Sequence, residues 1–200
     1  KTINIGGKIM IKIELKDGTI KEFEQQTSAL DIAYSISDGL ARAVVGAKIN
    51  GEVKDLMTKI DSDSKLEFLK FDDIDGKDVF WHTSTHIMAQ AVKRLFPEAK
   101  LAIGPAIENG FYYDIDLEHR LTPEDLEKIE QEMKKIVKEG FDVERFELSR
   151  EESVKLMKEM KEDYKVELIE ALEEGSTISF YKQGEFVDLC AGPHLPTVKK

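Results

Sequence analysis

The sequence has little cysteine, little histidine and no long apolar run. It has one cysteine and four histidines in 200 residues. A single cysteine cannot form a disulfide within the chain, so we expect a reducing, cytoplasmic location. No run of about 18 apolar residues is present, and the first ten residues lack the apolar core of a signal peptide. We therefore expect no membrane-spanning segment and no membrane partner.

Positive charge is also scarce. The chain carries 29 Lys and Arg against 40 Asp and Glu, a net charge of −11. Residues 1–70 are balanced, with 11 residues of each sign, so the whole excess lies in residues 71–200. Non-specific binding to nucleic acid needs clustered Lys and Arg. Any contact with RNA must therefore be local, or be supplied by other parts of a larger protein.

The few histidines and the cysteine are grouped. His82 and His86 lie in FWHTSTHIMAQAVKRLF, residues 80–96, which we predict to be a helix. A spacing of four places both imidazoles on one face of that helix. The opposite face is apolar, as in a helix that packs on a core, through Met88, Ala91, Val92 and Leu95. The helix thus presents two imidazoles toward a predicted cleft.

The same four-residue step occurs near the end of the chain, where Cys190 and His194 lie in DLCAGPH. Gly192 and Pro193 argue against a helix there, so we expect a strand end followed by a turn. Imidazole and thiol groups in such pairs serve in Zn²⁺ ligation or in acid–base chemistry, and both interpretations remain open. The fourth histidine, His119, lies beside a turn and is interpreted as a surface residue.

The first part of the chain has the pattern of a small sheet domain. Alternating residues 8–14 and 19–24 flank Asp17-Gly18, a hairpin signal. Ser28 and Asp31 begin a short helix, and strands follow at 43–50 and 65–71, with a turn at Asn50-Gly51. This order predicts a ubiquitin-like β-grasp domain over residues 1–71. The stretch FDDIDGKDV is acidic and is expected to be rich in turns, and it is predicted to be the domain boundary.

Residues 72–200 predict a larger α+β domain. After the histidine helix we expect a hairpin around Asn109-Gly110, a strand in FDVERFELSR, and a last hairpin turning at Gln183-Gly184 that delivers Asp188 and Cys190. Three further helices are predicted, the first two from capping signals. They are a helix from Thr122 to Gly140 with an apolar stripe of Leu126, Ile129, Met133, Ile136 and Val137, a helix after the Ser149–Glu152 capping box, and a helix in YKVELIEAL.

Four stretches resemble the N-terminal part of a bacterial threonyl-tRNA synthetase, in the same order: WHTSTHIMAQAVKRLFP, IGPAIENGFYYD, YKVELI and VDLCAGPH. The resemblance covers essentially the whole chain. It implies a TGS domain at 1–71 and, at 72–200, the editing domain shared with alanyl-tRNA synthetases. The aminoacylating core lies outside this chain, and ATP and that core's own zinc are expected only there.

The implied reaction is hydrolysis of the ester between serine and the 3′ end of tRNA(Thr), by attack of a positioned water. The resemblance implies that His82 and His86 act on the water, Lys165 stabilises the oxyanion, and Asp188 binds the seryl ammonium. It also implies that Cys190 and His194 complete the catalytic set and that Tyr113 contacts the ester or the terminal adenosine. The expected partners are the acceptor end of tRNA(Thr) carrying serine and the remainder of a synthetase, which is expected to be a homodimer.

Two other interpretations of the sequence compete with the editing function. His82, His86, Cys190 and His194 form a plausible tetrahedral zinc set, which would make the domain a zinc-dependent hydrolase, although the resemblance favours editing with no required cofactor. The chain could instead be a non-catalytic RNA-binding or regulatory module of the TGS type. A nucleophilic Cys190 is disfavoured, because water can attack an activated ester without an acyl intermediate.

Overall fold

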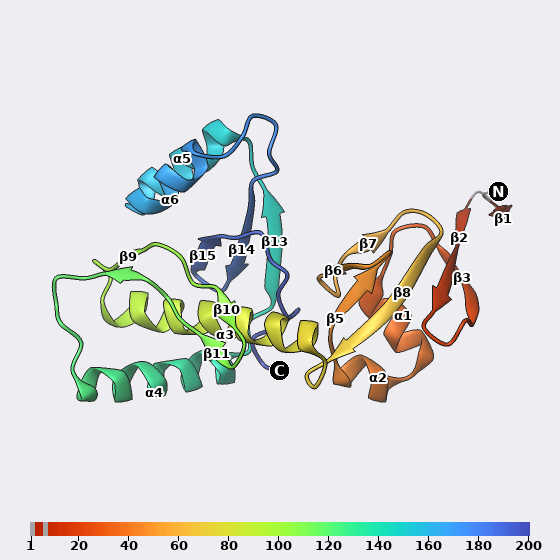
Figure 1. Cartoon of the computed structure of the whole chain (residues 1–200), viewed down its shortest axis with the longest axis horizontal. Coiled ribbons are helices and arrows are strands. Elements are labelled where there is room, and N and C mark those ends of the chain that lie inside the picture. The colour runs from red at the N-terminus through yellow and green to blue at the C-terminus, as the bar shows by residue number, and fades with distance from the viewer. Residues whose placement is uncertain (1–2, 6–7) are drawn as a thin grey trace. The chain divides into compact units, whose positions relative to one another are not determined.

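The structure is a computed structural model that describes residues 3–5 and 8–200, with side chains from residue 9 onward. The chain divides into two compact units (Figure 1). The first is Lys1–Phe80 with Pro193–Pro196, and the second is Trp81–Gly192 with Thr197–Lys200. Among the described residues, no helix is both long enough and apolar enough to cross a membrane.

The first unit is built on one mixed sheet. Its central strands are β2 (Lys8–Leu15) and β8 (Ser64–Lys70), which pair in parallel. β2 also forms the predicted hairpin with β3 (Ile20–Glu24), and β8 pairs antiparallel with β5 (Val44–Ile49). A hairpin followed by a helical crossing and a last strand beside the first is the β-grasp arrangement, so the predicted fold is confirmed. The smaller strands β1 (Ile3–Ile5) and β6 (Glu52–Lys54) extend this sheet, whereas β4 (Thr27–Ser28) and β7 (Lys59–Ile60) pair in a separate two-stranded sheet.

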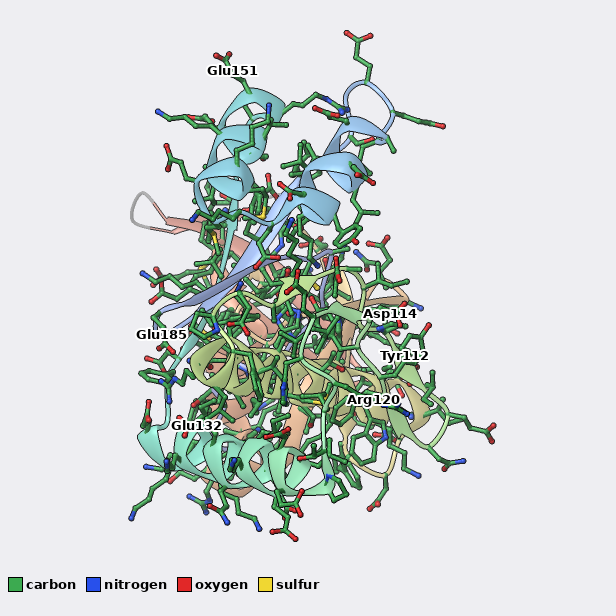
Figure 2. The ribbon with its side chains drawn as sticks, turned by 90° about the vertical axis from the view of Figure 1, so that its left-hand side faces the viewer. Tyr112, Asp114, Arg120, Glu132, Glu151 and Glu185 are labelled. Atoms are coloured by element: carbon green, nitrogen blue, oxygen red, sulfur yellow. The ribbon has the colours of Figure 1, made fainter. Side chains whose placement is uncertain are left out.

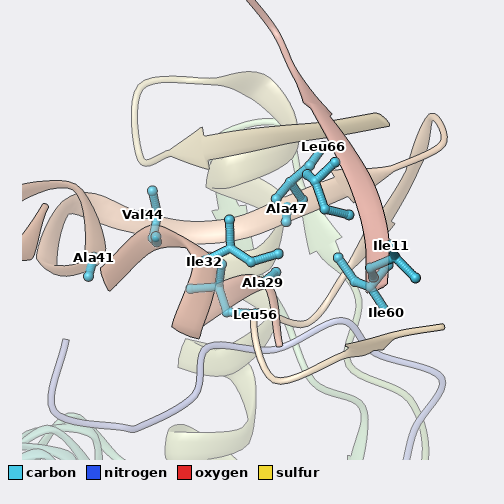
Figure 3. Packing of buried hydrophobic residues seen from close by; sticks show 11 residues of the cluster. Ile11, Ala29, Ile32, Ala41, Val44, Ala47, Leu56, Ile60 and Leu66 are labelled. Carbon is cyan, nitrogen blue, oxygen red and sulfur yellow. The ribbon is translucent and has the colours of Figure 1, made fainter. Parts of the chain in front are cut away.

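The helices of this unit cover one face of the sheet and bury its apolar side chains. The Ser28 side chain accepts a hydrogen bond from the Asp31 N–H and begins α1 (Ala29–Ile36), as predicted. The core between helix and sheet includes Ile11, Ala29, Ile32, Ala47, Leu56 and Leu66 (Figure 3). A second helix, α2 (Asp38–Ala43), was not predicted. Its N-cap, Ser37, ends α1 with an extended backbone and accepts from the Leu40 N–H.

The histidine helix begins earlier than the sequence pattern predicts. α3 spans Ile74–Leu95, so most of FDDIDGKDV is helical and the expectation of a turn-rich segment there was wrong. Two features start the helix early: the Asp73 carboxylate accepts from the Lys70 N–H, and the Asp73 carbonyl accepts from the Lys77 N–H. Gly76 marks a close approach rather than a turn, because a Cβ there would collide with the Lys70 carbonyl.

The second unit packs helices against a three-stranded sheet. α3 and α4 (Pro123–Glu139) lie side by side in Figure 1, joined by a core that includes Ala91, Val92, Ile129 and Ile136. A second core, under α5 and α6, includes Met157, Ile169 and Phe180. The antiparallel sheet has the order β13-β14-β15. The remaining elements are β13 (Val143–Glu147), α5 (Arg150–Glu159), α6 (Asp163–Glu170), β14 (Ser179–Gln183) and β15 (Phe186–Leu189).

The capping predictions for these helices are confirmed. α4 begins with a capping box between Thr122 and Asp125 and ends at Gly140 in the left-handed conformation, and α5 begins with the Ser149–Glu152 box. The apolar stripe of α4 is narrower than predicted: Ile129 and Ile136 are buried, but Leu126 is 58% exposed and Val137 is 36% exposed. Periodicity identified the buried face but not its width.

The predicted hairpin around Asn109-Gly110 is present and interrupted. Its tip is the pair β10 (Ala106–Ile107) and β11 (Gly110–Phe111). Its base is the pair β9 (Lys100–Leu101) and β12 (Ile115–Asp116). Tyr113 lies between β11 and β12, where the ladder is broken. This break leaves its side chain to be positioned by neighbouring groups rather than by a regular sheet.

Candidate active site

The α3 helix places its two histidines at different depths. His86 is 3% exposed, whereas His82 is half-buried, and their ring centroids are 5.5 Å apart. His86 also lies edge-on to the ring of Phe186, at 5.8 Å between centroids. On the predicted opposite face, Ala91 and Val92 are buried in the core, as the pattern indicated. His82 is therefore the more accessible imidazole, and His86 is packed behind it.

The β14–β15 hairpin brings Cys190 to the same place. The register pairs Gln183 with Phe186 across the predicted turn, and Cys190 follows directly after β15. Its Sγ lies 3.2 Å from Nε2 of His82 and accepts a hydrogen bond from the Gly192 N–H at 3.3 Å. The Cys190 carbonyl accepts from the Ser179 hydroxyl at 2.6 Å. The sulfur is thus held beside an imidazole by a fixed backbone.

Asp188 is the centre of a buried polar cluster. It is 3% exposed, and its carboxylate accepts a hydrogen bond from the Tyr113 hydroxyl at 2.6 Å. The Lys165 ammonium lies 2.9 Å from the other carboxylate oxygen and donates to the Tyr113 hydroxyl at 3.1 Å. Nε2 of His86 lies 3.4 Å from Asp188. Three residues from three distant parts of the sequence therefore surround one buried carboxylate.

The direct Lys165–Asp188 pair differs from the separate roles expected of the two residues. The Lys165 and Asp188 side chains are only 4% and 3% exposed, so each is the main neutralising charge of the other. A buried charge that loses its partner costs several kcal/mol, and this makes the pair a structural unit as well as a chemical one. A seryl ammonium that bound Asp188 would have to share the carboxylate with Lys165.

Burial also sets the protonation of the neighbouring groups. Desolvation lowers the pKa of His86 to about 4, although the Asp188 charge opposes that shift. His86 is consequently neutral at pH 7. Burial, and then the Asp188 charge, raise the pKa of Tyr113, so the phenol keeps its proton and remains a hydrogen-bond donor. The cluster at neutral pH is therefore one ion pair with a neutral imidazole and a neutral phenol.

Two supports of the cluster were missed in the sequence. Glu162 is 3% exposed, and its carboxylate contacts the Lys93 ammonium at 2.8 Å and the Leu101 N–H at 2.8 Å. Gly104 lies where a Cβ would collide with the Tyr113 ring and the Thr85 methyl. Glu162 stands in a run of charged residues that is typical of a solvated surface, so no sequence pattern distinguishes it. The Gly104 signal was its place inside the IGPAIENGFYYD stretch.

A more exposed network holds α3 to its neighbours on another side of the unit. The Arg94 guanidinium lies 2.8 Å from Glu139, 2.6 Å from Glu185 and 3.1 Å from Glu132. Figure 2 shows Glu132 and Glu185 on the same side of the molecule. These carboxylates raise the pKa of Arg94, chiefly through Glu139, and Arg94 lowers the pKa of Glu185 to about 2. The network connects α3 to α4 and to the β14–β15 turn.

The remaining two histidines have different settings. His194 is 1% exposed, and its N–H donates to the Asp55 carboxylate at 2.6 Å. His119 is at the surface, where Nε2 lies 2.7 Å from Asp125 and the ring stacks on Phe96, as its surface interpretation predicted. The ligand atoms of the four predicted metal-site residues all lie within 4.8 Å of one another. They belong to His82, His86, Cys190 and His194.

Comparison with known proteins identifies the first unit and then the chain. Residues 11–70 match the TGS domain family, and the β-grasp sheet is the fold of that part. Residues 11–70 therefore form a TGS domain. Over 96% of its length it is 68% identical to the threonine–tRNA ligase of Clostridioides difficile (strain 630) and 63% identical to that of Clostridium tetani (strain Massachusetts / E88). The ligase of Caldanaerobacter subterraneus subsp. tengcongensis is 63% identical over 92% of the chain.

The resemblance seen in the sequence motifs is thus confirmed. The chain corresponds to the N-terminal part of the threonine–tRNA ligases. It spans about 30% of the length of the relatives from Clostridioides difficile and Clostridium tetani, and 29% of the length of the relative from Caldanaerobacter subterraneus. Because the similarity spans 191 of the 200 residues, it includes residues 11–70 of the TGS match and also His82, His86, Asp188 and Cys190.

Proposed function

We propose that the second unit is an editing hydrolase that removes serine from mischarged tRNA(Thr). The observation that carries the proposal is the convergence of Tyr113, Lys165, Asp188 and His86 on one buried site beside His82 and Cys190. The similarity to threonine–tRNA ligases supplies the substrate class. An aminoacyl ester of tRNA is the natural target of acid–base groups in such a chain.

The proposed step is direct attack of water on the ester carbonyl. The half-buried His82 accepts a proton as the water oxygen bonds to the carbonyl carbon. The bond to the ribose oxygen then breaks, and that oxygen takes up a proton, which gives serine and tRNA with a free terminal hydroxyl. Lys165 and the Tyr113 hydroxyl lie close enough together to donate to the charge that develops on the carbonyl oxygen.

Asp188 has two proposed roles in this scheme. It holds Lys165 and Tyr113 through the contacts at 2.9 and 2.6 Å. It also supplies the negative charge that binds the seryl ammonium. The seryl ammonium would compete with Lys165 for this carboxylate, and the Lys165 ammonium would then be released toward the reacting ester. The neutral His86 helps to orient the carboxylate, and Cys190 and His194 complete the wall of the site.

The need for such a step follows from the size of one methyl group. Serine lacks the threonine methyl, and a binding pocket gains only about 1–3 kcal/mol from one such group. A second site that admits serine and excludes the larger side chain supplies further discrimination. The full ligase, with its remaining domains and as a homodimer, is the proposed setting in which this unit captures tRNA(Thr); ATP belongs to the aminoacylation step of that larger protein.

The first prediction is selective hydrolysis. The chain is expected to release serine from Ser-tRNA(Thr) and to leave Thr-tRNA(Thr) intact, measured by loss of radiolabelled amino acid from each tRNA. The matched control is a His82→Ala variant, which should deacylate neither substrate above the buffer rate. Equal rates on the two esters would refute the editing assignment. If the chain is inactive on both esters, the same assay is repeated with the full-length ligase, and inactivity there would refute the editing assignment.

A zinc-dependent hydrolysis is the alternative at the same residues. The nitrogen and sulfur donors of His82, His86, Cys190 and His194 suit zinc. Their ligand atoms lie within 4.8 Å of one another. Tetrahedral bonds of about 2.0–2.3 Å place ligand atoms roughly 3.3–3.8 Å apart, so the four side chains would have to move closer together to bind the ion. These four residues would hold the ion, and zinc there would polarise the ester or a bound water. Four protein ligands close the coordination shell, and one would have to leave to admit that water.

The second prediction separates these two mechanisms. We expect Ser-tRNA(Thr) deacylation to survive a metal chelator, and Cys190→Ser to keep much of it, because a hydroxyl replaces a hydrogen-bonding thiol but is a poor zinc ligand. Elemental analysis of the purified protein gives the metal content. Stoichiometric zinc, with activity that is lost to chelator and restored by Zn²⁺, would establish the metal mechanism. A folded but inactive Cys190→Ser protein would also contradict direct attack by water.

A second candidate function rests on the TGS match at residues 11–70. The first unit is compact and has its own core, and it could serve as an RNA-binding or regulatory module. Its charge is balanced, so binding would depend on local contacts rather than on a general positive surface. Binding of tRNA(Thr) that persists in a hydrolysis-deficient His82→Ala chain, without any deacylation by the unaltered chain, would favour this function.

A further inference from the structure

Glu162 is a buried carboxylate at the start of α6, the helix that carries Lys165. It stands at the N-cap position, and its carbonyl accepts hydrogen bonds from the N–H groups of Lys165 and Val166 at 3.0 and 3.2 Å. The residue before it, Lys161, has φ +59, a left-handed conformation that a non-glycine residue adopts only when its surroundings impose it. The first turn of α6 is therefore held by specific contacts.

The Glu162 side chain supplies those contacts. One carboxylate oxygen accepts from the Leu101 N–H on β9 at 2.8 Å, and the other lies 2.8 Å from the Lys93 ammonium on α3. Lys93 is fixed in turn, because it also donates to the Pro97 and Ala99 carbonyls at 3.1 and 2.7 Å. A single carboxylate thus joins α6 to β9 and α3.

The three joined elements are the ones that carry the proposed active site. α3 holds His82 and His86, β9 is at the base of the hairpin that holds Tyr113, and α6 holds Lys165 one turn after Glu162. Lys165 reaches Asp188 and Tyr113 only if α6 keeps its position, since the contacts are 2.9 and 3.1 Å. We infer that Glu162 is a positioning residue for the proposed hydrolysis, which fastens α6 so that Lys165 meets the ester. The inference rests on the proposed function.

The chemistry of the linkage makes the effect specific. Glu162 touches neither the proposed ester site nor Asp188, so its loss should leave substrate capture unchanged and impair the step that uses Lys165. A catalytic group displaced by about 1 Å can lose about 10²-fold in rate. We expect Glu162→Gln, which keeps an acceptor for the Leu101 N–H but removes the charge that binds Lys93, to lower kcat for Ser-tRNA(Thr) about 10- to 100-fold with KM unchanged.

The control is Glu167→Gln, an identical change on the exposed side of the same helix, which should leave kcat unaltered. A thermodynamic cycle tests the route of action. In a Lys165→Met background, Glu162→Gln should lower kcat no further, because the group that it positions is gone. Independent and additive effects would mean that Glu162 acts through general stability, and would overturn the inference. Should Glu162→Gln unfold, the charge-neutral pair Lys93→Met/Glu162→Gln takes its place.

A second readout needs no activity. Lys165 is buried in its ion pair and should react slowly with acetic anhydride, as followed by mass spectrometry of the unaltered chain. Glu162→Gln should speed its acetylation about tenfold or more relative to the exposed Lys182, while Glu167→Gln should not. Unchanged acetylation of Lys165 in Glu162→Gln would overturn the inference. Absence of any deacylation by the unaltered protein would count against the proposed function instead, and the acetylation result would still decide whether Glu162 positions Lys165.

Discussion

Replacing Lys165 by alanine is expected to lower Ser-tRNA(Thr) deacylation by about 10²–10⁴-fold, the range typical of a lost acid–base or electrostatic group. It is also expected to lower the free energy of unfolding by about 3–5 kcal/mol, because Asp188 is 3% exposed and would lose its charged partner. Single-turnover deacylation and urea denaturation measure the two effects. The sequence alone indicated only the first, since it did not show that the two residues pair.

A double variant separates the two effects. Lys165→Met/Asp188→Asn removes both charges and keeps similar shapes, so it should recover most of the lost stability. It should not recover activity, because the proposed donor and the carboxylate are both gone. Lys182→Ala, on the exposed side of β14, should change neither quantity. A Lys165→Ala protein that is folded and fully active would remove Lys165 from the mechanism.

Most elements of the fold could be predicted because their signals are local. Ser28, Thr122 and Ser149 cap helices as their sequence context indicated, and Gly18 and Gly184 turn hairpins with positive φ. The errors arise at side-chain contacts that hydrophobic periodicity does not report. α3 begins at Ile74 because the Asp73 carboxylate accepts from the Lys70 N–H at the end of β8, and α2 forms behind its N-cap, Ser37, although Gly39 weakens its helix propensity. Both contacts are short-range, but neither is visible in a periodic pattern.

The residues of the candidate site also differ in how far the sequence alone could select them. His82, His86, Cys190 and His194 could be selected because their types are rare and their spacing is regular, and their ligand atoms do come together. Lys165, Asp188 and Tyr113 were selected through the family resemblance, and only three-dimensional packing shows that they contact one another. Glu162 could not be selected at all, because a buried glutamate and a surface glutamate look alike in a charged run.

Gly192→Ala is expected to produce a second large loss, for a steric reason. Gly192 has φ +75, and a Cβ there would collide with the Tyr181 hydroxyl and lie 2.6 and 2.9 Å from two of its ring carbons. Tyr181 is 3% exposed on β14 and cannot move aside without disturbing the core. The backbone after Cys190 must shift instead, which breaks the Gly192 N–H contact to Sγ. We expect about 3 kcal/mol or more of lost unfolding free energy.

The matched control is Gly175→Ala, at φ +82 with no atom within 4 Å of the added Cβ. That change carries the left-handed strain alone, about 1–2 kcal/mol, and should leave deacylation intact. Gly192→Ala should in addition lower deacylation at least tenfold at temperatures where the protein remains folded, because His82 faces the displaced sulfur at 3.2 Å. Equal stability losses in the two variants would show that the loop after Cys190 relaxes freely. The geometry of this loop would then place no constraint on the proposed active site, and the fold would not hold the Cys190 sulfur beside His82.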